Sequence, residues 1–387
     1  MGISGNICCR DEKMYKSIKS QFNNIQLLIG LQKNEDFTEL NSVLQCLCNI
    51  KPLADYFKYK FDNIKQTEFY KKNHKNDKCL TESFNNIIDK IWPNDFSERK
   101  RDNNQELKIF SKTENSREFL EKIKNINEFN ENNEFLINYI IKRFHMEANK
   151  VVNSNQTEPL LEEIDKKSAF KKYVKKFEKE NKSIISDNFY GTYYTKTYCT
   201  NCNNNFFIFN AFTFSFYSLD IVYNNKCTTI LSRTNLLYTN NMFNLCQINI
   251  YDCLYYDMQS KNKIQICKKC AVQTNLVFQN IIYASPKIIT FIFKRNIFLP
   301  TIQFIIEENI NIDFFVEQKN NKNYFLIGMI FNVFENHFVS YCKSPIDNNW
   351  YSYDDEKVEK KDSFQQILMN NMYPYILLYQ IKEETIN

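Results

Sequence analysis

The sequence predicts an α+β fold, with a helical first half and a strand-rich second half. Apolar residues recur at helical spacing in several segments between residues 38 and 182. Aromatic and β-branched residues dominate many segments from residue 187 onward, as is typical of strands. Hydrophobic residues make up 43% of the 387 residues and aromatic residues 16%, so we expect a large core rather than extensive disorder.

Charge and cysteine usage narrow the class of protein. The net charge of +5 is mild and gives no indication of a nucleic-acid partner. The thirteen cysteines lack the regular spacing of a secreted disulfide domain, so we expect a reducing compartment, cytoplasmic or nuclear. No apolar run reaches the ~18 residues of a transmembrane helix. Membrane tethering is expected only if Gly2 and Cys8 or Cys9 are acylated, and Asn6 stands where that motif prefers Ser or Thr.

The first predicted helix follows a polar tail (residues 1–24) and a short loop. One helical face carries five apolar residues: Leu40, Val43, Leu44, Leu47 and Cys48. Thr38 stands at the expected N-cap, and Glu39 follows in the first turn. Pro52 ends the pattern. Because hydrolases often place a nucleophile at such a loop–helix junction, Thr38 is the first candidate site residue.

Two further segments are predicted to be helices. Residues 129–146 have a thick apolar face, and His145 is expected on the helix surface rather than in catalysis. Residues 166–182 are amphipathic, with lysines on one side and an aromatic face on the other. We expect that aromatic face to pack on the protein; binding to an acidic membrane surface is the alternative.

The second half contains the predicted strands. Five segments have strand composition: residues 187–199, 206–216, 281–293, 324–333 and 373–379.

Two Cys-x-x-Cys pairs lie within this half, Cys199 with Cys202 and Cys267 with Cys270. Four thiolates presented by two such turns complete a tetrahedral zinc site with no open position, so the zinc is expected to be structural.

Residues 30–47 resemble the cysteine box of the ubiquitin-specific proteases, the papain-like deubiquitinases, whose pattern is close to GLxNLGNTCYMNSxLQxL. Gly30 and Leu31 match its start, and residues 41–47 match its end. The nucleophile position falls on Thr38 and the usual oxyanion-hole Asn on Asp36. Residues 134–136 likewise match the Glu-Phe-Leu of a later family helix, whose preceding Gln-Asp pair is replaced.

A histidine box strengthens the resemblance. Residues 324–332, 337–341 and 350–355 are similar to three consecutive family motifs. The resemblance implies that His337 is the general base and that Asp354 orients it, since a carboxylate fixes the imidazole tautomer. Three of the five glycines, at positions 30, 191 and 328, also fall on family glycine positions.

The resemblance therefore implies a papain-like ubiquitin-specific protease fold over residues 25–385. A helical thumb would cover about 25–185, β fingers bearing the zinc about 186–280, and a β-rich palm about 281–385. The implied partner is ubiquitin or a ubiquitin-like protein, with a larger protein complex as a further partner.

The chemistry at the nucleophile position argues against catalysis. A threonine hydroxyl lacks the acidity of a cysteine thiol, and an ionised Asp36 has no proton to donate to an oxyanion. Cys46 lies ~12 Å further along the helix and cannot substitute. The leading hypothesis is an inactive pseudo-deubiquitinase that binds ubiquitin or a partner. An active deubiquitinase and a protein-interaction scaffold without ubiquitin binding are the alternatives.

Overall fold

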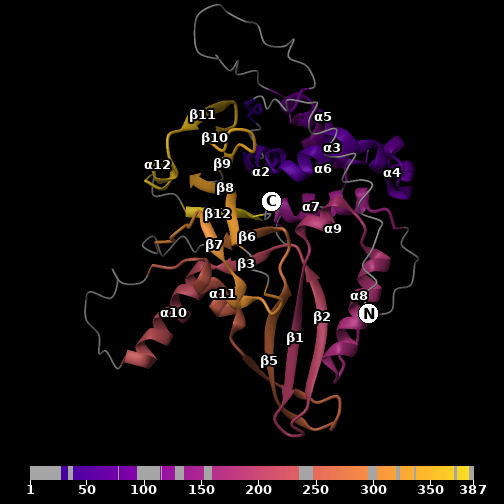
Figure 1. The fold of residues 1–387 in the computed structure, drawn as a ribbon, viewed down its shortest axis with the longest axis vertical. Coiled ribbons are helices and arrows are strands. Elements are labelled where there is room, and N and C mark those ends of the chain that lie inside the picture. Colours follow the sequence, from indigo (N-terminus) through magenta and orange to yellow (C-terminus); the bar gives the residue numbers. More distant parts are fainter. Residues whose placement is uncertain are drawn as a thin grey trace, which may run out of the picture.

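The computed structural model describes residues 28–33, 38–76, 78–93, 114, 116–126, 135–151, 159–234, 247–294, 303–319, 323–334, 337–369 and 373–382. A helical region packs against one face of a large sheet, and long strands extend away from it (Figure 1). Gly2, Cys8, Cys9 and Asp36 lie outside the described residues.

The helical region contains α2 to α7 and the short α9. Their bounds are α2 Thr38–Cys48, α3 Lys51–Lys65, α4 Glu68–Asn73, α5 Leu80–Ile91, α6 Arg117–Asn125, α7 Leu136–Ala148 and α9 Ile184–Phe189, with a 3-10 turn at His74–Asn76. Helix α2 begins at Thr38, so this residue belongs to the first turn rather than preceding it. Pro52 lies in the first turn of α3, where a missing N–H costs nothing, which explains the break before it.

An eight-stranded sheet forms the centre of the molecule. Its order is β11-β10-β9-β8-β12-β6-β3, with β7 also pairing β8. The strands are β3 Ser215–Ser218, β6 Ile288–Lys294, β7 Asn309–Asn311, β8 Asn323–Phe334, β9 His337–Lys343, β10 Trp350–Asp354, β11 Lys357–Lys361 and β12 Tyr373–Ile381.

Alternation along the central strands divides the core in two. On β12, Ile376 and Leu378 pack toward the helical region, while Leu377 and Tyr379 face the opposite side. That opposite side is covered by α10 (Leu219–Thr234) and α11 (Ile250–Met258), with a 3-10 turn at Asp313–Phe315 and α12 (Phe364–Leu368) alongside. Because both faces are covered, the middle of β12, residues 376–379, is fully buried.

A second sheet carries the long strands. Its order is β2-β1-β5-β4, all antiparallel, with β1 Gly191–Cys199, β2 Asn205–Phe212, β4 Lys261–Ile266 and β5 Gln273–Ala284. Helix α8 (Lys166–Glu180) runs beside β2 (Figure 1). Its predicted aromatic face, including Phe170 and Tyr173, packs on Tyr194 and Phe209 of this sheet. The lysine-rich side is largely left to solvent.

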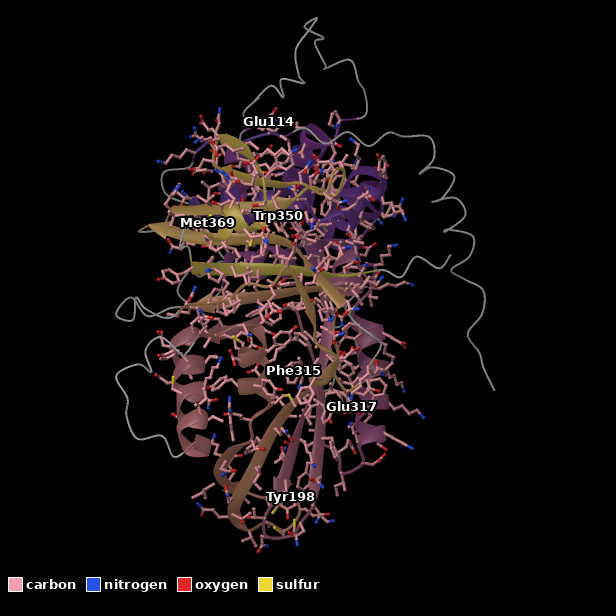
Figure 2. The ribbon with its side chains drawn as sticks, turned by 60° about the vertical axis from the view of Figure 1, so that its left-hand side comes forward. Glu114, Tyr198, Phe315, Glu317, Trp350 and Met369 are labelled. Carbon is pink, nitrogen blue, oxygen red and sulfur yellow. The ribbon has the colours of Figure 1, made fainter. Side chains whose placement is uncertain are left out.

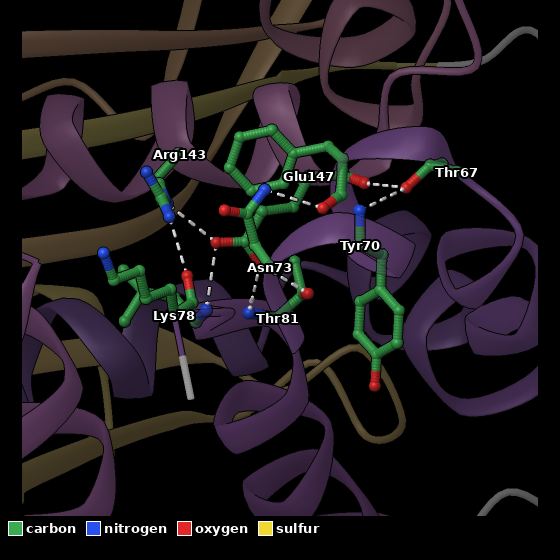
Figure 3. A network of polar contacts seen from close by, with 9 residues as sticks. Thr67, Tyr70, Asn73, Lys78, Thr81, Arg143 and Glu147 are labelled. Carbon is green, nitrogen blue, oxygen red and sulfur yellow. Dashed lines mark hydrogen bonds and ion pairs between the residues drawn. The ribbon is translucent and has the colours of Figure 1, made fainter. Parts of the chain in front are cut away.

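A buried ion pair holds the helical region together (Figure 3). Glu147 of α7 is fully buried and accepts hydrogen bonds from the backbone N–H groups of Leu80 and Thr81 at the start of α5. Arg143 donates to the same carboxylate at 2.8 Å and to the carbonyl of Lys78 at 2.7 Å. The Glu147 carboxylate therefore caps the N-terminus of α5, and the positive charge of Arg143 balances its negative charge.

Four further expectations need correction. The segment 281–293 is two strands, because Pro286 lies in the turn between β5 and β6. The segment 206–216 likewise divides into β2 and the start of β3. Helices α10 and α11 interrupt the half expected to be strand-rich. His145 is 8% exposed, with Nδ1 2.7 Å from Ser183 Oγ, so it is a buried residue and not a surface one.

Within the described part of the chain, no helix combines the length and apolar character needed to span a membrane.

Candidate functional site

Two neighbouring strands bring His337 and Asp354 together. Strand β9 begins at His337 and β10 ends at Asp354, and because the strands are antiparallel these two ends lie side by side. The distance from His337 Nε2 to Asp354 Oδ1 is 2.9 Å. The two side chains are 30% and 45% exposed, so the pair opens to solvent. Since Asp354 holds Nε2, the ring nitrogen Nδ1 is the atom that can take a proton from a reacting group.

Asp355 lies beside this pair, with a carboxylate oxygen within 4.8 Å of the facing atoms of His337 and Asp354, but it is more deeply buried. Its backbone is left-handed, with φ of 48°, a conformation that Asp tolerates better than most residues. Its carboxylate is buried and accepts a hydrogen bond from Asn41 Nδ2 at 2.7 Å. Burial raises the pKa of the Asp355 carboxyl, against the lowering effects of that hydrogen bond and of His337. Asn41 also donates to the carbonyl of Gln32 at 2.8 Å, so it fixes the Asp355 turn to the chain before α2.

The first turns of α2 face the same strand ends. Ser42 Oγ donates to the carbonyl of Phe338, next to His337, at 2.9 Å. Glu39 Oε1 accepts a hydrogen bond from the hydroxyl of Tyr375 on β12 at 3.0 Å. Thr38 lies one turn before Ser42, about 6 Å along the helix axis. Thr38, the position predicted for a nucleophile, is therefore on the helix end that packs beside the His337–Asp354 pair.

Neither nearby cysteine offers a replacement thiolate. Cys46 and Cys48 are buried, and Cys46 Sγ lies 3.6 Å from the buried Cys342 Sγ. Burial raises the pKa of the Cys48 and Cys342 thiols, which keeps both protonated. The described site thus holds a histidine–carboxylate pair beside a helix that begins at Thr38.

The four predicted zinc ligands converge at the far end of the four-stranded sheet, next to Tyr198 in Figure 2. The Sγ atoms of Cys199 and Cys270 are 4.0 Å apart, and those of Cys202 and Cys267 are 3.8 Å apart. Four thiolates at 2.3 Å from one zinc lie ~3.8 Å from one another, so the cluster has the size of a zinc site.

The two turns that carry these cysteines have the same backbone design. Asn203 N donates to the Cys199 carbonyl and Ala271 N to the Cys267 carbonyl, at 3.0 and 2.9 Å. Both donor residues, each directly after the second cysteine, have a positive φ of 54° and 56°. Hydrogen bonds from Asn204 lower the pKa of the Cys202 thiol to about 6. The donor set therefore fits a structural zinc ion, which these four residues would hold with no position open to substrate.

Some contacts of the site were absent from the sequence prediction. Glu39 with Tyr375, Asn41 with Asp355, and Ser42 with Phe338 join residues about 300 or more positions apart. The sequence signal was that all six residues fall inside segments already singled out, residues 30–47, 337–341, 350–355 and 373–379.

The comparisons with known proteins agree with this architecture. A family model described as ubiquitin carboxyl-terminal hydrolase matches residues 31–379. Bovine ubiquitin carboxyl-terminal hydrolase 2 is 23% identical over 381 residues, which cover 92% of this chain and 55% of that protein. The chain therefore spans about half the length of that relative.

Solved structures show the same fold. A chain of the yeast SAGA DUBm with an Sgf73 mutant superposes with a TM-score of 0.63 at 15% identity, covering 98% of this chain and 76% of that one. A chain of the SAGA Ubp8/Sgf11/Sus1/Sgf73 module bound to monoubiquitin gives 0.60 at 16% identity, with the same coverage.

Fold and site together define a papain-like hydrolase scaffold with a histidine–aspartate pair. The chain belongs to the ubiquitin carboxyl-terminal hydrolase family, in its ubiquitin-specific protease branch.

Proposed function

We propose that this family member binds ubiquitin, or a partner protein, without cleaving it. The observation that carries the proposal is the mismatch within one site. His337 and Asp354 keep the contact that a general base and its orienting residue need, while Thr38 occupies the nucleophile position at the start of α2. In this proposal His337 and Asp354 pack and polarise the cleft instead of activating a nucleophile.

The surroundings of Thr38 support the loss of catalysis. Glu39 adds a carboxylate in the first turn of α2, and the sequence places Asp36, at the oxyanion position, two residues before Thr38. Negative charge close to a developing oxyanion raises the barrier instead of lowering it. The buried thiols of Cys46 and Cys48 cannot reach the cleft without rebuilding the helix.

The proposal includes the expected division into thumb (25–185), fingers (186–280) and palm (281–385), a cytoplasmic or nuclear location, and zinc in the fingers. Related chains have been solved in a module bound to monoubiquitin, which makes ubiquitin the first ligand to test here. A complex with further proteins is part of the same proposal.

An electrophilic probe built on the ubiquitin C-terminus tests the proposed absence of catalysis. We expect no covalent adduct in the intact mass of the wild-type chain, and the same result for Thr38→Ala. An adduct on the wild type that is lost in Thr38→Ala would establish an active threonine deubiquitinase, the second candidate, which the intact His337–Asp354 contact favours.

Calorimetric titration with ubiquitin tests the proposed binding of ubiquitin. We expect saturable binding in the micromolar range. An absence of heat at high micromolar ubiquitin, with the protein folded and loaded with zinc, would point to a scaffold without ubiquitin binding.

A further inference from the structure

The second sheet has one open edge. Its β2 edge is covered, because Glu163 exchanges two backbone hydrogen bonds with Phe207, and α8 packs beside it. Strand β4 forms the other edge. All six of its residues are exposed or half-exposed, and nothing in the described part of the chain pairs with its outer side.

The hydrogen-bond pattern identifies the outward-facing backbone groups. Cys267 N donates to the Val272 carbonyl at 3.0 Å, so the pair 267–272 extends the β4–β5 ladder. In antiparallel strands such bonded pairs alternate, so Lys261, Lys263 and Gln265 bond to β5. The N–H and C=O groups of Asn262, Ile264 and Ile266 therefore point outward.

A contact on the far side of β5 gives the same assignment. Asn275, which faces Ile264 across the ladder, directs its carbonyl to Thr200 N after β1, at 3.3 Å. The Asn275 carbonyl therefore points away from β4. This is expected if Asn275 and Ile264 face each other without hydrogen bonds between them.

Two of the three residues with outward backbone groups, Ile264 and Ile266, also carry exposed apolar side chains. Ile264 and Ile266 are 70% and 67% exposed and share one face, while Lys261 and Lys263 share the other. Lysine is a common means of protecting a free edge from pairing with like copies. Two exposed isoleucines on the opposite face offer no such protection and have no packing role within the described residues.

We propose that β4 is a docking edge for an extended segment of another protein, which adds to the sheet as a fifth strand. Its residues opposite Ile264 and Ile266 would be apolar, and those opposite Lys261 and Lys263 would be acidic. A second copy of this chain is disfavoured, because antiparallel pairing of two β4 strands would gather four lysines on one face. This inference is independent of the ubiquitin proposal.

A synthetic peptide of alternating valine and glutamate, labelled with a fluorophore, tests the proposal by anisotropy with the full zinc-loaded chain. We expect saturable binding. N-methylation of the valines removes the donors that face β4 but keeps charge and side chains, and should weaken binding by about tenfold or more. A peptide with lysine in place of glutamate should not bind.

Two substitutions at Ile264 distinguish the role of its backbone N–H from that of its side chain. Ile264→Pro removes one outward donor without touching a ladder bond to β5, and should weaken binding about tenfold. Ile264→Thr keeps the donor and should weaken binding less. Lys263→Glu, which leaves the edge backbone unchanged and Lys261 in place, should reduce the preference for the glutamate peptide over the lysine peptide.

Equal binding of the N-methylated peptide would overturn the proposal, as would equal binding by Ile264→Pro with unchanged zinc content and circular dichroism. If Ile264→Pro does not fold, unchanged peptide preference in Lys263→Glu would overturn it instead. A dimer of the wild type in sedimentation that is lost in these variants would show that the edge serves a second copy, which also contradicts the proposal.

Discussion

The hydroxyl of Tyr375 donates a hydrogen bond to Glu39 Oε1 at 3.0 Å, and so ties the last strand to the first turn of α2. Tyr375 also packs its ring on Phe338, with centroids 5.0 Å apart. Glu39 stands where the family pattern has a tyrosine. Burial, and then the charge of Glu39, raise the pKa of Tyr375, so the tyrosine remains a donor at all working pH values.

We expect this contact to stabilise the folded chain. Tyr375→Phe and Glu39→Gln should each lower the free energy of unfolding, with a coupling of about 1 kcal/mol between them because the acceptor is charged. Denaturant unfolding of the two single variants and the double variant measures that coupling. A coupling near zero would mean that water replaces the Tyr375 hydroxyl as donor to Glu39 without a loss of stability.

Restoring the thiol alone should not restore turnover. In Thr38→Cys the nucleophile is present, but the sequence still places Asp36 at the oxyanion position. Loss of one oxyanion donor costs ~10²–10³ in rate. We therefore expect Thr38→Cys with Asp36→Asn to hydrolyse a fluorogenic ubiquitin substrate at least about 100-fold faster than Thr38→Cys alone. Comparable rates would show that the oxyanion position matters little here.

Gly30 is a position where packing excludes any side chain. A Cβ there would lie 2.2 Å from the carbonyl oxygen of Glu356, in the turn directly after Asp354 and Asp355. Gly30→Ala should cost about 3 kcal/mol or more of unfolding free energy, because backbone must move. The matched control is Gly328→Ala, whose Cβ would come no closer than 3.4 Å to Cys46 Sγ. If thermal unfolding shows equal losses, the contact with Glu356 is not the cause.

His145 should make stability depend on pH. Burial lowers its pKa to about 4, against an ordinary value of 6.5. Between these values the unfolded chain binds a proton that the folded chain does not, so stability is complete above pH 6.5 and falls as the pH falls toward 4. The difference amounts to about 3 kcal/mol. Urea unfolding at pH 7 and pH 4 should show that His145→Gln loses this part of the pH dependence. His74→Gln, a change of a less buried histidine, should retain it.

Metal removal should destabilise the end of the four-stranded sheet. We expect one zinc per chain by elemental analysis, and a fall in the unfolding midpoint of about 5–10 °C on chelation. Cys202→Ser with Cys270→Ser should abolish zinc retention, whereas Cys227→Ser on α10 should not. Full zinc content in the double variant would place the ion elsewhere.

Local patterns predicted much of this fold. Helix α2 follows from apolar periodicity, strands β8 and β12 follow from strand-forming composition, and the four-cysteine cluster follows from two short spacings. The aromatic face of α8 packs as its amphipathic pattern predicted.

Two errors, at α10 and at His145, arose where tertiary packing decided the outcome. Helix α10 has little amphipathic pattern and was not predicted, and the burial of His145 depends on Ser183 and Tyr190, which come from another element. The partners of Glu39, Asn41 and Ser42 lie about 300 positions or more away, and no periodicity reports such pairings.

These contacts between residues far apart in the sequence can form only late in biosynthesis. Helix α2 leaves the ribosome early, but Asn41 and Ser42 meet Asp355 and Phe338 only after nearly the whole chain has been made. Until then the helix carries an apolar face and unsatisfied polar groups without its sheet. A nascent chain stopped before β9 therefore lacks these partners, and its α2 exposes the apolar face that the sheet covers in the folded chain.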